Sequence, residues 1–182
     1  QHRFGVSDRM RMVAKGFAPH VLVMSATPIP RTLALSIHGD MDLSVLDEKP
    51  PGRMPINTAA MPISRSEDVA DAIADAAKRG ERAYWVCPLI EESEVVDLAA
   101  VEDRYEELKA RFGSGVELVH GRMNPTAREA AMDRFRSGES FLLVATTVIE
   151  VGVNVPEATI MVIEHAERFG LAQLHQLRGR VG

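Results

Sequence analysis

Amide and basic side chains follow one another closely near the C-terminus. Gln176, Arg178 and Arg180 fall within a span of five residues, and Gly179 separates the two arginines. A guanidinium group offers a planar fork of N–H donors that matches two phosphate oxygens at once. The sequence from Leu171 onward favours a helix that carries these side chains to its end. The pattern therefore indicates a surface that faces phosphate groups.

Small hydroxyl residues mark a second place suited to phosphate. Thr146 and Thr147 follow the apolar run 141–145, which we predict to be a buried strand. The carboxyl end of a parallel strand is where α/β proteins present ligand-binding residues, and threonine hydroxyls contact nucleic-acid phosphates without adding charge. Gly152 would let the backbone approach such a ligand closely. A capped loop without a ligand explains the same residues equally well.

A similar junction lies near the N-terminus. Ser25, Ala26 and Thr27 stand between a predicted strand at 21–24 and a predicted helix at 29–37. Their hydroxyls could cap the helix or relay hydrogen bonds between two sides of a sheet. On the residues alone, a structural turn and cap is the simpler interpretation.

Histidine and cysteine offer little catalytic or metal chemistry in this chain. His120, Gly121 and Arg122 follow a predicted strand at 116–119, and a lone histidine there is more simply structural. The six histidines have no paired ligand spacing and Cys87 is the only cysteine, so we predict no metal site. Cys87 cannot form an internal disulfide, and its apolar surroundings predict a core thiol rather than a nucleophile.

Short apolar runs alternate with longer amphipathic stretches along the chain. That alternation predicts an α/β fold, with a parallel sheet covered by helices on both faces. Asn124 and Pro125 have the residue types of a helix N-cap and first turn. The predicted strands are 21–24, 56–61, 83–90, 116–119, 141–145 and 160–163, and the predicted helices include 29–37, 67–79, 97–112, 125–136 and one starting near 171.

The predicted elements divide unequally around a proline-rich stretch. Residues 47–55 contain three prolines and a glycine, which disfavour regular structure and indicate a linker. Residues 1–46 hold about one strand and two helices, too little for an independent core. Residues 56–182 hold enough elements for one three-layer α/β domain.

Composition and charge exclude several classes of protein. The net charge of −5 excludes a surface that is basic overall, so a nucleic-acid footprint would have to be local. None of the four lysines stands in a G-x-x-x-x-G-K-[S/T] loop, so the chain carries no phosphate-cradling loop of an NTPase. No apolar run approaches about eighteen residues and no secretion leader opens the chain. We therefore expect a cytoplasmic protein without membrane contacts.

Several of these stretches are long enough to resemble a known family. The motifs are Ser25-Ala-Thr-Pro-Ile-Pro-Arg31, the stretch Ala145-Thr-Thr-Val-Ile-Glu-Val-Gly-Val-Asn-Val-Pro156, and the end Phe169-Gly-Leu-Ala-Gln-Leu-His-Gln-Leu-Arg-Gly-Arg180. Together they resemble the RecG family of superfamily 2 DNA helicases. The resemblance implies a RecA-like P-loop NTPase fold and an enzyme that hydrolyses ATP, with Mg²⁺, to remodel branched or forked DNA. Its implied processes are fork reversal and Holliday-junction branch migration in recombination and repair.

The resemblance also implies roles for single residues. Arg180 corresponds to an arginine that reaches the γ-phosphate of ATP, and Gln176 stands with it in the same catalytic motif. Gly152 and Asn154 fall in the nucleotide-binding part of the second motif, where the family usually has aspartate in place of Asn154. An amide can still hydrogen-bond a ribose hydroxyl.

Two further sets of residues take roles from the same resemblance. The DNA-binding set lies at strand ends and consists of Gly121, Arg122, Thr146 and Thr147. The set that couples nucleotide state to DNA grip lies in the first part of the chain and consists of Gln1, His2, Ser25, Ala26 and Thr27.

The resemblance implies an internal fragment of such a motor. Residues 1–46 would be the tail of the first RecA-like domain, 47–55 the linker, and 56–182 the second domain, ending in its last motif. We expect no ATP turnover by this piece alone, since the P-loop and the magnesium carboxylates lie outside it. An unpaired apolar strand at 21–24 would favour self-association.

Two other interpretations stay open. A translocase like the transcription-repair coupling factors shares most of the motifs, but the segment 84–94 resembles the RecG family instead. The chain could also be a nucleotide-independent α/β domain that binds nucleic acid or serves as a scaffold. Such a domain would have the same fold, and its motif residues would serve only as caps of helices and loops.

Overall fold

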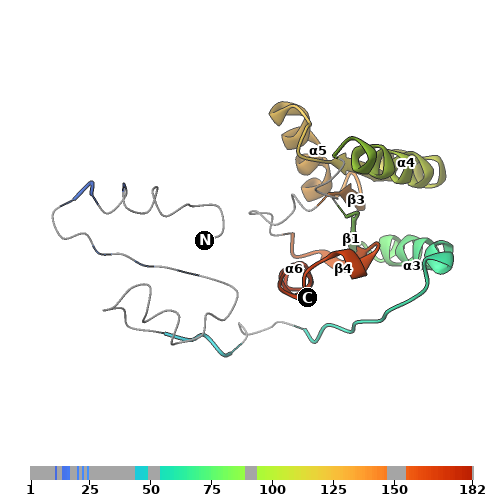
Figure 1. The fold of residues 1–182 in the computed structure, drawn as a ribbon. Coiled ribbons are helices and arrows are strands. Elements are labelled where there is room, and N and C mark those ends of the chain that lie inside the picture. Colours follow the sequence, from blue (N-terminus) through green and yellow to red (C-terminus); the bar gives the residue numbers. More distant parts are fainter. Residues whose placement is uncertain are drawn as a thin grey trace. The chain divides into compact units, whose positions relative to one another are not determined.

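The computed structural model describes residues 11, 14–16, 20, 22, 24, 44–48, 54–88, 94–146 and 155–181 (Figure 1). The chain separates into two compact units, 1–49 and 50–182. In the first unit, Leu22 and Met24 are exposed and lie in no strand, so the strand predicted for 21–24 is wrong at these two positions. The helix predicted for 29–37 lies outside the described residues.

The second unit is built on a four-stranded sheet in which every neighbouring pair is parallel. Its strands are β1 (Arg82–Val86), β2 (Val116–Val119), β3 (Leu142–Ala145) and β4 (Ala158–Ile163), in the order β2-β3-β1-β4. All four overlap strands that the sequence predicts. β2 has the predicted bounds, while β1 ends at Val86, short of the predicted residue 90.

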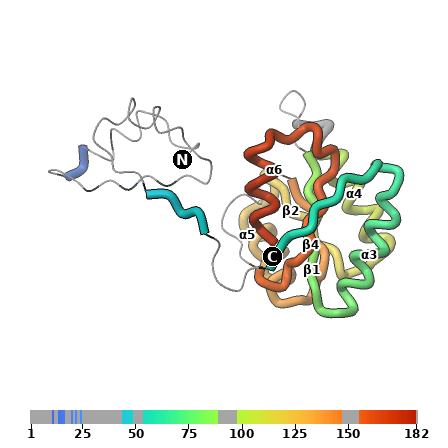
Figure 2. Tube along the Cα trace, turned by 90° about the horizontal axis from the view of Figure 1, so that it is seen from below, coloured from blue at the N-terminus to red at the C-terminus, as the bar shows by residue number. Residues whose placement is uncertain are grey.

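Helices cover both faces of this sheet, as predicted. They are α3 (Ser66–Lys78), α4 (Glu94–Phe112), α5 (Pro125–Ser137) and α6 (Leu171–Arg178), with short 3₁₀ turns η1 (Ile63–Arg65), η2 (Gly113–Gly115) and η4 (Ala166–Arg168). Figure 2 shows α5 and α6 on one side of the strands and α3 and α4 on the other. No helix in the described ranges is long and apolar enough to cross a membrane.

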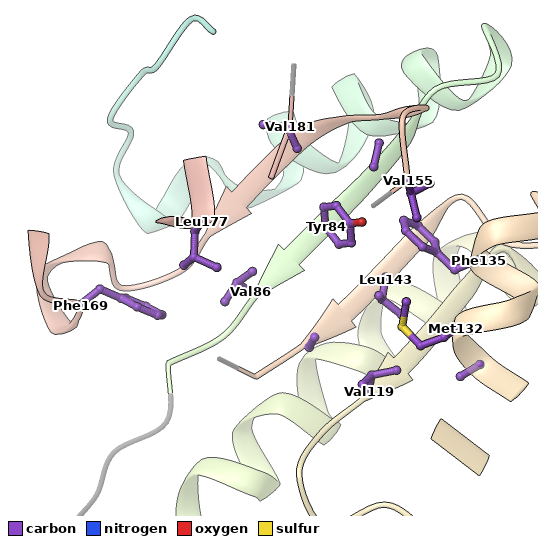
Figure 3. Close-up of a cluster of buried hydrophobic side chains, with 13 residues drawn as sticks. Tyr84, Val86, Val119, Met132, Phe135, Leu143, Val155, Phe169, Leu177 and Val181 are labelled. Carbon is purple, nitrogen blue, oxygen red and sulfur yellow. The ribbon is translucent and has the colours of Figure 1, made fainter. Parts of the chain in front are cut away.

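Side chains that alternate along the strands pack into two separate cores, one on each face of the sheet. Tyr84 and Val86 of β1 face α5 and α6, where Tyr84 packs against Phe135 with ring centroids 5.2 Å apart (Figure 3). Ala83 and Trp85 of the same strand face α3 and α4. Because a strand that is buried on both faces must be apolar on both, residues 83–86 of β1 and all of β3 appear in the sequence as unbroken apolar runs.

The start of α5 shows how local sequence sets an element. Asn124 accepts a hydrogen bond at Oδ1 from the Thr126 amide, 2.9 Å away, and Pro125 occupies the first turn. The helix ends at Gly138, whose φ of 85° suits a residue without a Cβ. The predicted cap is confirmed. The strand predicted for 56–61 is wrong, since residues 54–62 have no regular secondary structure and pair with no strand among the described residues.

Candidate site at the carboxyl edge of the sheet

A buried polar residue follows each of the four strands directly. They are His120 after β2, Thr146 after β3, Cys87 after β1 and Glu164 after β4, and their exposed fractions are 8%, 0%, 3% and 9%. Backbone hydrogen bonds extend the sheet to three of these residues. The amides of Thr146, Cys87 and Glu164 donate to the carbonyls of Val119, Ala145 and Val86 over 3.3, 2.9 and 2.9 Å. The sheet itself therefore fixes where these side chains lie.

The β2–β3 end of the row brings predicted DNA-binding residues together. Val119 and Ala145 are register partners, so the loop with Gly121 and Arg122 starts beside Thr146. Gly121 and Arg122 are exposed, and Thr146 is buried at the base of this loop. The row thus places an arginine and a glycine backbone at the surface next to a buried hydroxyl.

Two buried polar atoms at this end lack hydrogen-bond partners within the described residues. They are Nδ1 of His120 and Oγ1 of Thr146. A buried donor or acceptor without a partner costs about 1–3 kcal/mol, so a site that keeps two of them is suited to a polar ligand or to water. The N-terminus of α5 follows four residues after Gly121, and helix N-termini favour anions. The arrangement can hold phosphate oxygens by neutral donors, with one arginine for charge.

The β1–β4 end of the row has different chemistry. Sγ of Cys87 lies 3.7 Å from Oε2 of Glu164. Burial raises the pKa of the Cys87 thiol, and the negative charge of Glu164 raises it further. A thiol held in its neutral form is a poor nucleophile, so the prediction of a core thiol is confirmed.

Glu164 is paired with Arg104 of α4, which sequence reasoning missed. Nε of Arg104 lies 2.6 Å from Oε1 of Glu164, at 18% and 9% exposure, in an ion pair rather than a directed hydrogen bond. The Arg104 guanidinium also lies over the Trp85 ring, 5.6 Å from its centroid. One sequence signal existed: Glu164 continues the alternation of Ile160 and Val162, which face the α3 and α4 core. A charge at that register position needs a buried partner.

The chain after β4 runs back along the sheet. His165 takes a left-handed conformation with φ of 48°, η4 follows, and α6 packs Leu177 into the core. In Figure 3, Phe169 lies near Val86 at the carboxyl end of β1, while Val181 lies farther back, toward Val155. The chain from Phe169 to Val181 therefore leads away from the carboxyl end of β1.

Arg180 is one of three arginines whose positive charge acts on Tyr84, in the middle of β1. Burial raises the pKa of Tyr84 to about 12, and the positive charges of Arg180, Arg136 and Arg82 act in the opposite direction. Arg82 begins β1 and Arg136 lies in the last turn of α5, so both belong to the amino edge of the sheet. Arg180 and Gln176 are both partly exposed. The structure thus does not bring them together with Gly121, Arg122 and Thr146.

Several predicted residues fall outside the described part of the chain. These are Gln1, His2, Ser25, Ala26, Thr27, Thr147, Gly152 and Asn154. Arg178, the other arginine beside Gly179, is described, and it donates to the carbonyl of Ile56 over 3.3 Å. No group of three potential metal ligands occurs among the residues with described positions.

Comparisons with known proteins show which family the chain matches. The family described as "Helicase conserved C-terminal domain" matches residues 65–182. The chain is 56% identical over 188 residues to the ATP-dependent DNA helicase RecG of Escherichia coli strain K12 and 55% identical over 183 residues to that of Acidithiobacillus ferridurans. All of the chain aligns in both cases, and it spans 27% of each relative's length.

Solved structures give the same result for the fold. A structure titled "Structure of RecG bound to three-way DNA junction" is 46% identical, with a TM-score of 0.70, and the match covers 87% of this chain and 21% of that one. A Saccharomyces cerevisiae Dbp5 variant bound to RNA shares the fold at 20% identity, with a TM-score of 0.50 over 65% of this chain and 29% of that one. The α/β, RecA-like architecture expected from the sequence is confirmed. The chain belongs to the family of helicase conserved C-terminal domains and is similar to RecG helicases along its whole length.

Proposed function

We propose that this chain is a segment of an ATP-dependent DNA helicase that remodels branched or forked DNA in the cytoplasm, in recombination and repair. Residues 56–182 would be its second RecA-like domain, joined through 47–55 to the end of the first domain at 1–46. The similarity to RecG helicases along the whole chain, at 55–56% identity, supports this proposal most strongly. A relative whose title names a three-way DNA junction supports branched DNA as the substrate.

The DNA backbone would bind at the β2–β3 end of the carboxyl edge. The single structural observation behind this assignment is that neighbouring parallel strands deliver Gly121, Arg122 and Thr146 to one place, where polar atoms of His120 and Thr146 have no hydrogen-bond partner among the described residues. Thr147 would extend the same contact. Glycine backbone and hydroxyl contacts to phosphate hold a strand without reading its sequence, which suits a motor that moves along DNA.

The nucleotide would be contacted by a different part of the domain, the segment that ends in Arg180. Arg180, with Gln176 in the same helical segment, would reach the γ-phosphate of ATP held by the first domain, while Gly152 and Asn154 would contact its sugar side. An arginine in that position stabilises the charge of the transition state. Mg²⁺, when bound with ATP, neutralises charge that develops on the phosphates. The described residues of this chain offer no cluster of ligands for it.

Movement would follow from closing and opening the two domains. ATP binding draws Arg180 toward the cleft while Arg122 and Thr146 hold the DNA, and hydrolysis releases that closure. Gln1, His2, Ser25, Ala26 and Thr27 would transmit the nucleotide state between the domains. The present chain carries no phosphate-cradling loop, so by itself it should neither bind ATP tightly nor hydrolyse it.

Binding measurements on this chain test the division of labour. Fluorescence anisotropy with a labelled forked DNA and with labelled ATP, each at two salt concentrations, should show weak DNA binding that falls with salt and no saturable ATP binding. Saturable ATP binding would contradict the assignment of the nucleotide cradle to the first domain. The absence of DNA binding at low salt would contradict the carboxyl-edge assignment.

Activity measurements test the function itself. A protein of the relatives' length that carries this chain should hydrolyse ATP faster in the presence of a three-way junction than of linear duplex, and should unwind the junction. Equal stimulation by both DNAs would favour a duplex translocase like the coupling factors. DNA binding without any ATP hydrolysis would favour a nucleotide-independent binding domain.

A further inference from the structure

A charged side chain stands where the sheet would otherwise bury an apolar one. Ile160 and Val162 of β4 face the core under α3 and α4, and Glu164 continues that face one step beyond the strand. Its side chain is 9% exposed. A carboxylate buried to this degree is costly unless a positive partner and hydrogen bonds compensate it.

Arg104 supplies that partner from α4. Its Nε lies 2.6 Å from Glu164 Oε1, and its Nη1 lies 2.5 Å from Oε2 of Glu107, one helical turn along. Its Cζ lies over the ring of Trp85 of β1, 5.6 Å from the ring centroid. Glu107 and Trp85 thus help to hold the Arg104 side chain in the orientation in which it contacts Glu164. The pair joins the middle of α4 to the residue that follows β4.

Glu164 is also the residue at which the backbone hydrogen bonds of β4 to the sheet end, before the chain reaches α6. Its amide donates to Val86 and ends the β4–β1 ladder. His165 follows in the left-handed region, which few non-glycine residues adopt without support from their surroundings. The chain then passes through η4 to α6 and Arg180. The direction of the chain at Glu164 therefore sets where α6 begins.

We propose that the buried Arg104–Glu164 ion pair is a positioning device for the segment 165–180, and through it for Arg180. The pair would act by fixing the turn from which α6 departs. Its consequence for catalysis rests on the proposed function, whereas its control of the segment 165–180 does not. Glu164→Gln removes the charge that anchors the turn to Arg104 of α4, so the turn should lose its fixed position while Arg104 keeps only Glu107 as an acidic partner among the described residues.

The first test uses this chain and Glu164→Gln, with Glu117→Gln as the matched control. Glu117 makes an equally close pair with Arg134, at 2.6 Å, but joins β2 to α5 and does not touch the segment 165–180. Amide chemical shifts and hydrogen exchange measured by NMR should change across residues 165–180 in Glu164→Gln and only near β2 and α5 in Glu117→Gln. Changes confined to the neighbours of Glu164 would overturn the proposal.

The second test uses the longer motor that carries this chain and separates positioning from stability. Glu164→Gln should lower kcat for DNA-stimulated ATP hydrolysis about ten- to a hundredfold, because small misplacements of a catalytic group have effects of that size. KM for ATP should stay within about twofold, since the cradle for the phosphates lies elsewhere. A wild-type motor without ATP hydrolysis would refute the proposed function, and the NMR result would still decide the role of the pair.

A double variant guards against a simple folding defect. Arg104→Met combined with Glu164→Leu replaces the pair by apolar side chains, and such replacements commonly restore stability. We expect this variant to regain the thermal midpoint of the wild type and to keep the lowered kcat. Recovery of kcat together with the midpoint would show that the pair contributes stability alone and would overturn the positioning role.

Discussion

Two regions of the second unit carry the proposed chemistry, and they are positioned in different ways. The residues after β2 and β3 sit directly on strand ends, where the ladder between Val119 and Ala145 fixes them. Arg180 instead lies 16 residues beyond Glu164 (180 minus 164), at the end of a turn and a helix. The hydrogen bonds of the sheet fix the position of the first region. The position of the second region depends on the contacts that hold α6.

That difference matches the two tasks in the proposed motor. A grip on DNA needs donors at constant spacing, which a sheet edge provides. A residue that responds to ATP must reach another domain, and a helix packed on the sheet can carry it there. Arg180 follows α6, whereas Gly121 and Arg122 follow β2, so changes in one region should leave the other largely intact.

The largest expected effect concerns Arg180. In the longer motor, Arg180→Ala should lower DNA-stimulated ATP turnover about a thousandfold while DNA affinity changes less than about twofold. Steady-state hydrolysis and anisotropy on the same preparation measure both quantities. Arg168→Ala, an exposed arginine of η4, is the control and should keep wild-type turnover. Equal losses of turnover and DNA binding would show that the two regions are not separate.

The hold of α6 on the sheet gives the next largest effect. Leu177 is 1% exposed and Leu171 is 86% exposed on the same helix. Leu177→Ala should lower the free energy of unfolding by about 2–5 kcal/mol, since it removes buried methyl groups and leaves a cavity. Leu171→Ala should change it by less than about 0.5 kcal/mol. Urea unfolding of this chain, followed by Trp85 fluorescence, compares the two; similar losses would mean that α6 does not pack as described.

The grip on DNA should be weakened more modestly by a single change. Arg122→Ala should weaken binding of forked DNA several-fold at moderate salt and reduce the slope of log affinity against log salt by about 1, as expected when one phosphate contact is lost. The loss should be equal for unrelated DNA sequences. Arg168→Ala again serves as control. An unchanged slope would remove Arg122 from the DNA contact.

Much of the strand-end region could be predicted from the sequence. The apolar runs before His120 and Thr146 became β2 and β3, and Asn124 caps α5 as its residue type indicates. Because parallel strands end at one edge, placing the strands was enough to bring Gly121, Arg122 and Thr146 together. The roles of these residues in DNA binding stay predictions.

The second region could not be derived in the same way. Arg104 and Glu164 are 60 positions apart (164 minus 104), and no local pattern connects them. The position of Arg180 depends on how α6 packs, which rests on a few apolar side chains such as Leu174, Leu177 and Val181. The strand wrongly predicted for 56–61 has a related cause: Ile56 packs against the α5–α6 core by itself, and an apolar pattern says nothing of whether a neighbouring strand exists.

The smallest expected effect concerns Cys87, which lies between the two regions. Burial, reinforced by Glu164, raises the pKa of its thiol in the folded chain. A group whose pKa is raised on folding stabilises the protein below its unfolded pKa, here about 8.5, and loses that contribution as the pH rises. The free energy of unfolding should therefore fall by about 0.8 kcal/mol from pH 7 to pH 9 on account of this thiol.

Urea unfolding at the two pH values, with Cys87→Ala as the comparison, isolates that contribution. Tyr84 does not interfere in this range, because its pKa is about 12 when folded and about 10 when unfolded. The wild type should lose stability between pH 7 and 9, and Cys87→Ala should lose about 0.8 kcal/mol less. Equal pH dependence of the two proteins would mean that the thiol ionises as readily in the folded chain as in the unfolded one. The carboxyl edge would then be open to water at β1, and the buried row from His120 to Glu164 would be interrupted between the two regions.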